Sequence, residues 1–87
     1  MKTKFDEYLE FPCRFPFKVL ALKDPALVDN VVAVVQQYVP GEYSPKMKDS
    51  GKGTYQSVTI DVTVSSKEQV ETLYQSLSEV KGVRTVL

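Results

Sequence analysis

The stretch 55–77 constrains the fold most, because its apolar residues alternate at every second position and then recur at every third or fourth. As a strand, 55–64 would carry Val58, Ile60, Val62 and Val64 on one face, and Tyr55, Ser57, Thr59, Asp61 and Thr63 on the other. Such alternation is typical of an antiparallel sheet with one covered face, since strands buried on both faces read as continuous apolar runs. The sequence therefore predicts a sheet whose second face is open to water or to a partner.

Before this stretch, the sequence predicts a central strand, a helix and an edge strand. The apolar run 17–22 has the composition of a central strand. Asp24-Pro25 is typical of a helix start, and Pro40-Gly41 of a helix end. Residues 43–48 follow as a strand that Pro45 confines to a sheet edge, because proline cannot donate to a ladder. The buried stripe of the helix would comprise Val28, Val31, Val32, Val35 and Val39.

After the hairpin loop 49–53 and the long strand, a second helix and a last strand complete the fold. Ser65 with Glu68, or Ser66 with Gln69, can form a capping box. The helix would bury Val70, Leu73, Tyr74, Leu77 and Val80, end at Gly82, and lead into a strand over 83–87. The order β-α-β-β-α-β is that of the ferredoxin-like α+β sandwich, in which right-handed crossovers place both helices on one face of a four-stranded antiparallel sheet.

The chain of 87 residues has the length of a single domain, 1–87. We expect residues 1–15 to be an irregular N-terminal segment, within which residues 1–10 could form one amphipathic turn with Phe5, Tyr8 and Leu9 on one side. The N-terminus lacks the apolar run of a signal peptide, and no apolar stretch is long enough to span a bilayer, so we expect a cytoplasmic protein. Oligomerisation stays an open alternative, because so small a core gains from further burial.

The composition excludes most catalytic chemistry. Without histidine, Ser-His-Asp and Cys-His arrangements and histidine-based metal sites cannot form. Cys13 is the only cysteine, which excludes an internal disulfide and a zinc site built from cysteine pairs. An acylphosphatase-like activity on this fold would need an arginine in the turn after the first strand, and that turn has none. We expect no catalytic residue, no cofactor and no metal.

Charge gives no long-range attraction to a partner, because eleven basic residues cancel eleven acidic ones. Lys46, Lys48 and Lys52, opposed by Asp49, have the pattern of a solvated turn. We therefore expect a protein partner, self-association or a small-molecule ligand, and neither nucleic acid nor a membrane.

The open sheet face is the predicted contact surface. If the alternation extends to the neighbouring strands, this face carries Lys18, Leu20, Tyr55, Ser57, Thr59, Asp61, Arg84 and Val86. Leu20 and Val86 would anchor a partner. The charges of Lys18, Asp61 and Arg84 would orient that partner. Two alternatives stay open: a solvated face with a Lys18–Asp61 pair worth less than about 1 kcal/mol, and docking at the edge strand 43–48.

The whole chain closely resembles the YbeD-like family of small bacterial proteins of unknown function. The resemblance is carried by Leu9-Glu10-Phe11-Pro12, Phe15, Lys18-Val19, Leu27-Val28-Asp29, Val34-Val35-Gln36, Pro40-Gly41, Lys52-Gly53-Thr54-Tyr55, Ser57-Val58, Gln69 to Tyr74, Val83-Arg84 and Val86-Leu87. It implies a ferredoxin-like fold similar to the ACT-type regulatory domain of phosphoglycerate dehydrogenase. The family itself supplies no function, but the likeness to ACT domains prompts a regulatory interpretation. We therefore expect a non-enzymatic binding or regulatory module that acts through protein contacts or a small metabolite.

ACT domains commonly carry a glycine in the turn between the first strand and the first helix, where it lets a ligand approach the backbone closely. This chain has Ala21-Leu22-Lys23-Asp24-Pro25 there. We therefore carry over no ligand-binding residues from that family.

The alternative function is an RNA-binding module that uses the open face. Lys52-Gly53-Thr54-Tyr55 is similar to the central signature of RNA-recognition motifs, whose aromatic side chains stack on bases. Gln56, Ser57 and Thr59 leave this strand without a second aromatic platform, and the neutral net charge removes the usual attraction for phosphates. Protein contacts therefore remain the preferred interpretation.

Overall fold

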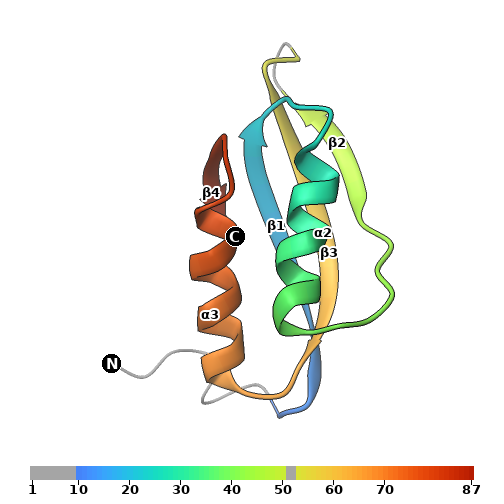
Figure 1. The fold of residues 1–87 in the computed structure, drawn as a ribbon, viewed down its shortest axis with the longest axis vertical. Coiled ribbons are helices and arrows are strands. Elements are labelled where there is room, and N and C mark those ends of the chain that lie inside the picture. The colour runs from blue at the N-terminus through green and yellow to red at the C-terminus, as the bar shows by residue number, and fades with distance from the viewer. Residues whose placement is uncertain (1–9, 51–52) are drawn as a thin grey trace.

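The computed structural model describes residues 10–50 and 53–87, and Figure 1 shows the arrangement of their helices and strands. The elements are β1 (Cys13–Leu22), α2 (Leu27–Tyr38), β2 (Lys46–Ser50), β3 (Tyr55–Val64), α3 (Lys67–Ser78) and β4 (Val83–Val86). The predicted order β-α-β-β-α-β is thereby confirmed. The amphipathic turn expected around Phe5, Tyr8 and Leu9 and the middle of the hairpin loop lie outside the described residues.

The described strands form one antiparallel sheet in the order β2-β3-β1-β4, and both helices cover the same face of it (Figure 1). Between the central strands, Val19 lies opposite Val58 and Lys18 opposite Thr59. Residues directly opposite in an antiparallel pair point to the same side, so this register fixes both faces. The buried apolar core lies between the helices and the sheet, and consists of Phe17, Val19, Ala21, Leu27, Val31, Val35, Val58, Ile60, Val62, Val64, Val70, Leu73 and Leu77.

The predicted stripes are largely confirmed. All four alternating apolar residues of β3 are fully buried, as are Val31 and Val35 of α2 and Val70, Leu73 and Leu77 of α3. Val28, Val32, Val39, Tyr74 and Val80 are half-buried at the margin of the core. Leu27 is fully buried as well, although the valine pattern had not included it.

Helix α2 begins two residues later than Asp24-Pro25 predicts, at Leu27 instead of Pro25. Asp24 does accept a hydrogen bond from a backbone amide, because its Oδ1 lies 2.8 Å from the N of Ala26. Its carbonyl oxygen also accepts from the N of Leu27 at 3.0 Å, which closes a turn around Pro25 and Ala26. The carboxylate therefore stabilises the turn before the helix, and Ala26 occupies the N-cap without a side-chain hydrogen bond.

Strand β2 is an edge strand as predicted, but it covers Lys46–Ser50 instead of 43–48. Tyr43 turns back to α2, where its hydroxyl donates to the carbonyl oxygen of Val39 at 2.5 Å and burial raises the pKa of its phenol. Pro45 cannot donate to a ladder, so pairing starts only after it. Asp49 and Ser50, which were expected in the loop, therefore belong to the strand.

Strand β1 begins at Cys13 and so includes the last three residues of the segment expected to be irregular, together with Pro16. Lys18 exchanges two backbone hydrogen bonds with Leu87 on the β4 side of β1. Pro16 lies two residues away and would point its missing N–H to that same side. Strand β4 pairs only with Val19–Ala21, so the proline removes no bond to β4.

Helix α3 starts with the second of the predicted capping boxes. The Oγ of Ser66 accepts from the N of Gln69 at 3.1 Å, and the Oε1 of Gln69 accepts from the N of Ser65 at 2.7 Å. We expect Ser66→Ala to lower the free energy of unfolding by about 1 kcal/mol, because it leaves a helix N–H without its acceptor. Urea unfolding followed by circular dichroism measures this loss. Ser65→Ala is the matched control, since Ser65 takes part through its backbone, and an equal loss in both variants would contradict the assignment.

Candidate contact surface on the open sheet face

The face of the sheet that the helices leave uncovered, here called the open face, is built from alternate residues of the strands. The register places on it Arg14, Pro16, Lys18, Leu20 and Leu22 of β1, Tyr55, Ser57, Thr59, Asp61 and Thr63 of β3, Lys46 and Lys48 of β2, Thr85 of β4, and Leu87 just beyond β4. Most of these side chains are exposed.

Six of the eight predicted contact residues lie on this face: Lys18, Leu20, Tyr55, Ser57, Thr59 and Asp61. Lys18 lies opposite Thr59, and Leu20 opposite Ser57, so these four are brought together at the middle of the sheet. Ser57 is only 6% exposed, and its hydroxyl donates to the carbonyl oxygen of Lys48 at 3.4 Å. Ser57 therefore supports the surface from within and offers little area to a partner.

The placement of Val86 on the open face was wrong. Val83 lies opposite Ala21 and Val86 opposite Val19, and both of these β1 residues belong to the core. Between them the ladder shifts register, because two β4 residues span one step of β1. The bulge turns Val86 toward the helices, where it is half-buried against the core, and gives its place on the open face to Thr85.

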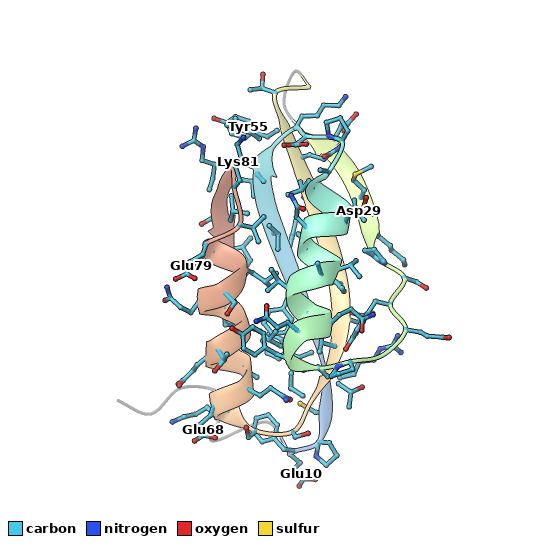
Figure 2. All side chains as sticks on the ribbon, in the orientation of Figure 1. Glu10, Asp29, Tyr55, Glu68, Glu79 and Lys81 are labelled. Atoms are coloured by element: carbon cyan, nitrogen blue, oxygen red, sulfur yellow. The ribbon has the colours of Figure 1, made fainter. Side chains whose placement is uncertain are left out.

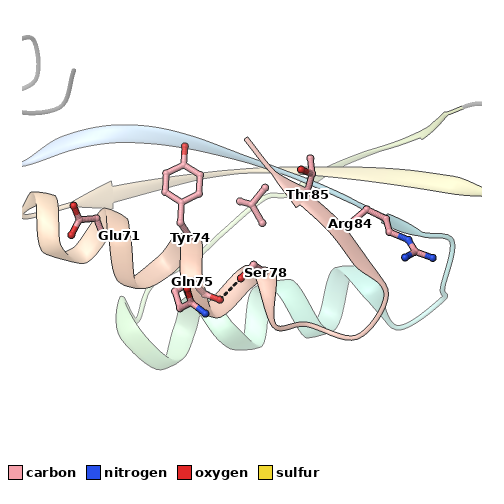
Figure 3. Close-up of a pocket in the computed structure, with 7 residues that line it drawn as sticks. Glu71, Tyr74, Gln75, Ser78, Arg84 and Thr85 are labelled. Carbon is pink, nitrogen blue, oxygen red and sulfur yellow. Dashed lines mark hydrogen bonds between the residues drawn. The ribbon is translucent and has the colours of Figure 1, made fainter. Parts of the chain in front are cut away.

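Arg84 lies within this bulge and lines a hollow of about 420 Å³ at the sheet edge (Figure 3). The other lining residues are Glu71, Tyr74, Gln75, Ser78, Thr85 and Val86. The hydroxyl of Ser78 donates to the carbonyl oxygen of Gln75 at 2.6 Å, and burial raises the pKa of the Tyr74 phenol. Arg84 thus belongs to the α3–β4 edge and not to the centre of the predicted surface.

The ion pair on the open face is not the one that the sequence suggested. The carboxylate of Asp61 lies 3.6 Å from the guanidinium of Arg14, which sequence reasoning had not singled out. Asp61 lies opposite Pro16, and Arg14 lies one row further along β1. Both side chains are largely exposed, so we expect the pair to contribute at most about 1 kcal/mol.

Lys46 and Lys48, predicted to sit in a solvated turn, project from β2 onto the open face. Lys46 lies opposite Thr59, and Lys48 opposite Ser57. Asp49 points to the other side of the sheet, where its carboxylate lies 3.4 Å from the ammonium of Lys23 and accepts a hydrogen bond from Gln56. The pleat thus separates both lysines from the acid that seemed to balance them in the sequence. Period-two alternation over 46–50 would have revealed this.

Among the described residues, Asp61 is the only acidic side chain that the strand pairings place on the open face, and the side chains of Lys18, Lys46 and Lys48 form no ion pair within 4.0 Å. Apolar side chains lie beside these lysines. Leu22 and Tyr55 face each other and are each 36% exposed, Leu87 is 62% exposed, and Leu20 is half-buried. The open face therefore joins a basic area to an apolar one.

The described residues contain no group of three or more acidic or thiol side chains that could hold a metal ion. Cys13 is half-buried at the start of β1 and forms no disulfide. None of the helices in residues 10–50 and 53–87 is long and apolar enough to cross a membrane. Among the described residues, the strand pairings place one carboxylate on the open face, that of Asp61.

Solved structures share this ferredoxin-like fold, and one of them is an ACT domain. The solution structure of protein HP0495 from Helicobacter pylori has a TM-score of 0.79 at 15% sequence identity, and the match covers 100% of this chain and 97% of that one. The crystal structure of the ACT domain from the GTP pyrophosphokinase of Chlorobium tepidum has a TM-score of 0.62, also at 15% identity, and the match covers 85% and 94%. These likenesses show a shared fold.

The chain belongs to the family described as "Protein of unknown function (DUF493)", which matches residues 6–87. A UPF0250 protein of Shewanella amazonensis is 61% identical over 87 residues, which cover 100% of this chain and 99% of that protein. A UPF0250 protein of Shewanella oneidensis is 59% identical over the same span. The resemblance to a family of small bacterial proteins of unknown function is confirmed.

Proposed function

We propose that this protein is a non-enzymatic regulatory module that docks on a protein partner through the open face of its sheet. The observation that carries this proposal is the surface itself: Lys18, Lys46 and Lys48, without acidic partners among the described residues, lie beside exposed Leu22, Tyr55 and Leu87. Exposed apolar side chains rimmed by charge are typical of protein interaction sites. The ACT-like fold is compatible with this function, but analogy of fold alone does not establish it.

Two aspartate substitutions on the open face test the proposal. We expect Leu22→Asp with Leu87→Asp to reduce the recovery of captured proteins in a quantitative pull-down from the native bacterium at least about tenfold, since charge replaces the apolar contact. Both residues are exposed, at 36% and 62%, so the variant should stay folded by circular dichroism. Met47→Asp is the matched control, because Met47 is 54% exposed but lies opposite Val58 on the helix side of β2.

Unchanged capture by a folded double variant would exclude the open face as the docking surface. If Met47→Asp lost capture and the double variant did not, the docking site would instead be the β2 edge, whose outer backbone groups can pair with an added strand. That edge is the second docking site considered from the sequence, now moved to Lys46–Ser50.

A further inference from the structure

The zero net charge of the chain conceals a separation of charge between its two layers. In the described residues, the open face carries Arg14, Lys18, Lys46 and Lys48 against one acid, Asp61. The helix layer has the opposite bias: α2 carries Asp29 and no base, while α3 and its C-cap carry Glu68, Glu71 and Glu79 against Lys67. Figure 2 shows Asp29 on α2 and Glu68 and Glu79 along α3, with the acids directed away from the core. A partner within a Debye length, about 8–10 Å, therefore meets a basic surface on the sheet side.

The basic residues occupy one part of the open face. Lys46, Thr59 and Lys18 lie in one row across three neighbouring strands, and Lys48 lies two residues along β2 from Lys46. Adjacent strands are about 4.8 Å apart, so the backbones of Lys46 and Lys18 are separated by about 10 Å. The same row ends in Leu87, which is paired with Lys18.

The apolar residues occupy the adjoining part. Leu20 and Leu22 follow β1 from Lys18, Tyr55 lies opposite Leu22, and Leu87 lies beside Lys18 on the far edge. The basic part of the surface thus lies over β2 and reaches Lys18 on β1, and the apolar part runs from Leu20 and Leu22 of β1 to Tyr55 of β3 and to Leu87 at the β4 edge. A partner that matches both sides must itself be amphipathic, with carboxylates along one side and aliphatic or aromatic side chains along the other.

We infer, on the basis of the function proposed above, that the partner presents an acidic amphipathic segment to the open face. Its carboxylates would lie against Lys18, Lys46 and Lys48, and its apolar side chains against Leu20, Leu22 and Leu87. A helix of about 14 residues is about 21 Å long, which suffices to cross the four described strands. Such a segment would use both sides of the surface at once.

A second copy of this chain fits the surface less well. A two-fold axis across the strands would bring the lysines of two facing copies together, and like charges in contact oppose association. A two-fold axis along the strands would place the lysines of each copy against the apolar part of the other, where they meet no carboxylate. The acidic helix layer of one copy could approach the basic open face of another, but that contact is heterologous and leaves a free face at each end. Self-association of this kind leads to open chains of molecules.

Single-stranded RNA would leave the apolar side of the surface unused. Binding without sequence preference combines a basic groove with aromatic side chains on which successive bases stack. Among the described open-face residues Tyr55 is the only aromatic, and Leu20, Leu22 and Leu87 are aliphatic. The surface therefore favours an acidic protein segment, and RNA becomes an outcome of the test.

The test is an NMR titration of the full ¹⁵N-labelled chain with a synthetic peptide of about 14 residues, with leucine at positions i, i+3, i+4 and i+7 and glutamate elsewhere. We expect saturable shifts of the amides of Lys18, Lys46 and Lys48. The dissociation constant should rise at least about tenfold when NaCl goes from about 50 to about 500 mM, because salt screens the contacts between charges. A twin peptide with lysine in place of glutamate should not bind.

Charge reversal locates the contact. Lys46→Glu with Lys48→Glu should weaken binding of the glutamate peptide at least about tenfold. Lys23→Glu with Lys81→Glu makes the same change in net charge at two residues that no strand pairing places on the open face, and should alter binding less than about twofold. The amide spectrum of each variant shows whether it is folded. An equal loss in both pairs would mean that net charge alone drives the association, and would overturn the inference.

Other outcomes separate this inference from the proposed function. No shift of these amides at millimolar peptide, while Leu22→Asp with Leu87→Asp still abolishes capture in the pull-down, would overturn the acidic partner and leave the docking face standing. Unchanged capture would overturn the docking face as well. Preferential, salt-sensitive binding of an oligouridine of about 15 nucleotides, lost in Tyr55→Ala, would replace the acidic segment by RNA.

Discussion

Ile60→Asp is expected to unfold the protein at neutral pH, whereas Thr59→Asp, one residue away, should leave it folded. Ile60 is 1% exposed and lies opposite the fully buried Phe17. A carboxylate there would lack a charged partner in the described core, and such burial costs about 5 kcal/mol or more, close to the whole stability of a small domain. Thr59 lies between Lys46 and Lys18 on the open face, so an aspartate there would gain up to about 1 kcal/mol from each lysine.

Circular dichroism and urea unfolding of the two variants measure this contrast. The pair is matched in the residue introduced, in the strand and in the change of net charge, so the difference reports which side of the sheet each position faces. Two variants of similar stability would contradict the assignment of Ile60 to the covered face and of Thr59 to the open face. A gain in Thr59→Asp that disappears in about 0.5 M salt would further show that Lys18 and Lys46 lie close to this position.

The β3 strand shows what a sequence alone can predict. Val58, Ile60, Val62 and Val64 are all buried as their alternation indicates, because in this strand the local period and the burial of one face coincide. The capping box of Ser66 and Gln69 was predicted for the same reason, since all its hydrogen bonds form within a few residues. The element order follows from such local signals taken in turn.

The misplaced boundaries had causes outside their own segments. Strand β1 reaches back to Cys13 because β3 is long enough to pair with it there. Strand β2 starts late because Tyr43 turns back to the carbonyl of Val39. Val86 was misplaced because a bulge against Leu20 shifts the register of β4. No short window of sequence contains both strands of the β1–β3 and β1–β4 pairings. Tyr43 and Val39 are only four residues apart, but nothing in the residue types marks their hydrogen bond.

The candidate surface was therefore predicted only in part. Period two placed Lys18, Leu20 and Tyr55 on the open face from β1 and β3 alone. Lys46 and Lys48 lie within the predicted edge strand 43–48, but their charges were interpreted as those of a solvated turn, so the predicted contact surface left them out. Their addition changes the electrostatic character of the face, because it supplies two of the three lysines without acidic partners among the described residues.

The second large effect on stability is expected at Phe17, the largest side chain at the centre of β1. Its ring is fully buried and contacts the rings of Phe15, with centroids 4.8 Å apart, and Tyr74, with centroids 5.2 Å apart at an interplanar angle of 69°. These contacts join the sheet to α3. Phe17→Ala should lower the free energy of unfolding by about 3–5 kcal/mol, through lost burial and the cavity that remains.

Urea unfolding of Phe17→Ala and Phe17→Leu measures this loss. Phe17→Leu should keep about half or more of the stability that Phe17→Ala loses, because leucine fills part of the space. A loss below about 1 kcal/mol for alanine would mean that the core does not depend on this ring.

Phe17 and Lys18 point to opposite sides of β1, so substitutions in the core should lower stability without weakening binding, and substitutions on the open face should weaken binding without lowering stability. At a temperature where Phe17→Ala is folded, this variant should bind the glutamate peptide with an affinity within about twofold of that of the unaltered chain. The double variant Lys46→Glu with Lys48→Glu should show the reverse: its free energy of unfolding should change by less than about 1 kcal/mol, and it should lose binding of the peptide. Weakened binding in folded Phe17→Ala would show that the open face depends on the packing beneath it.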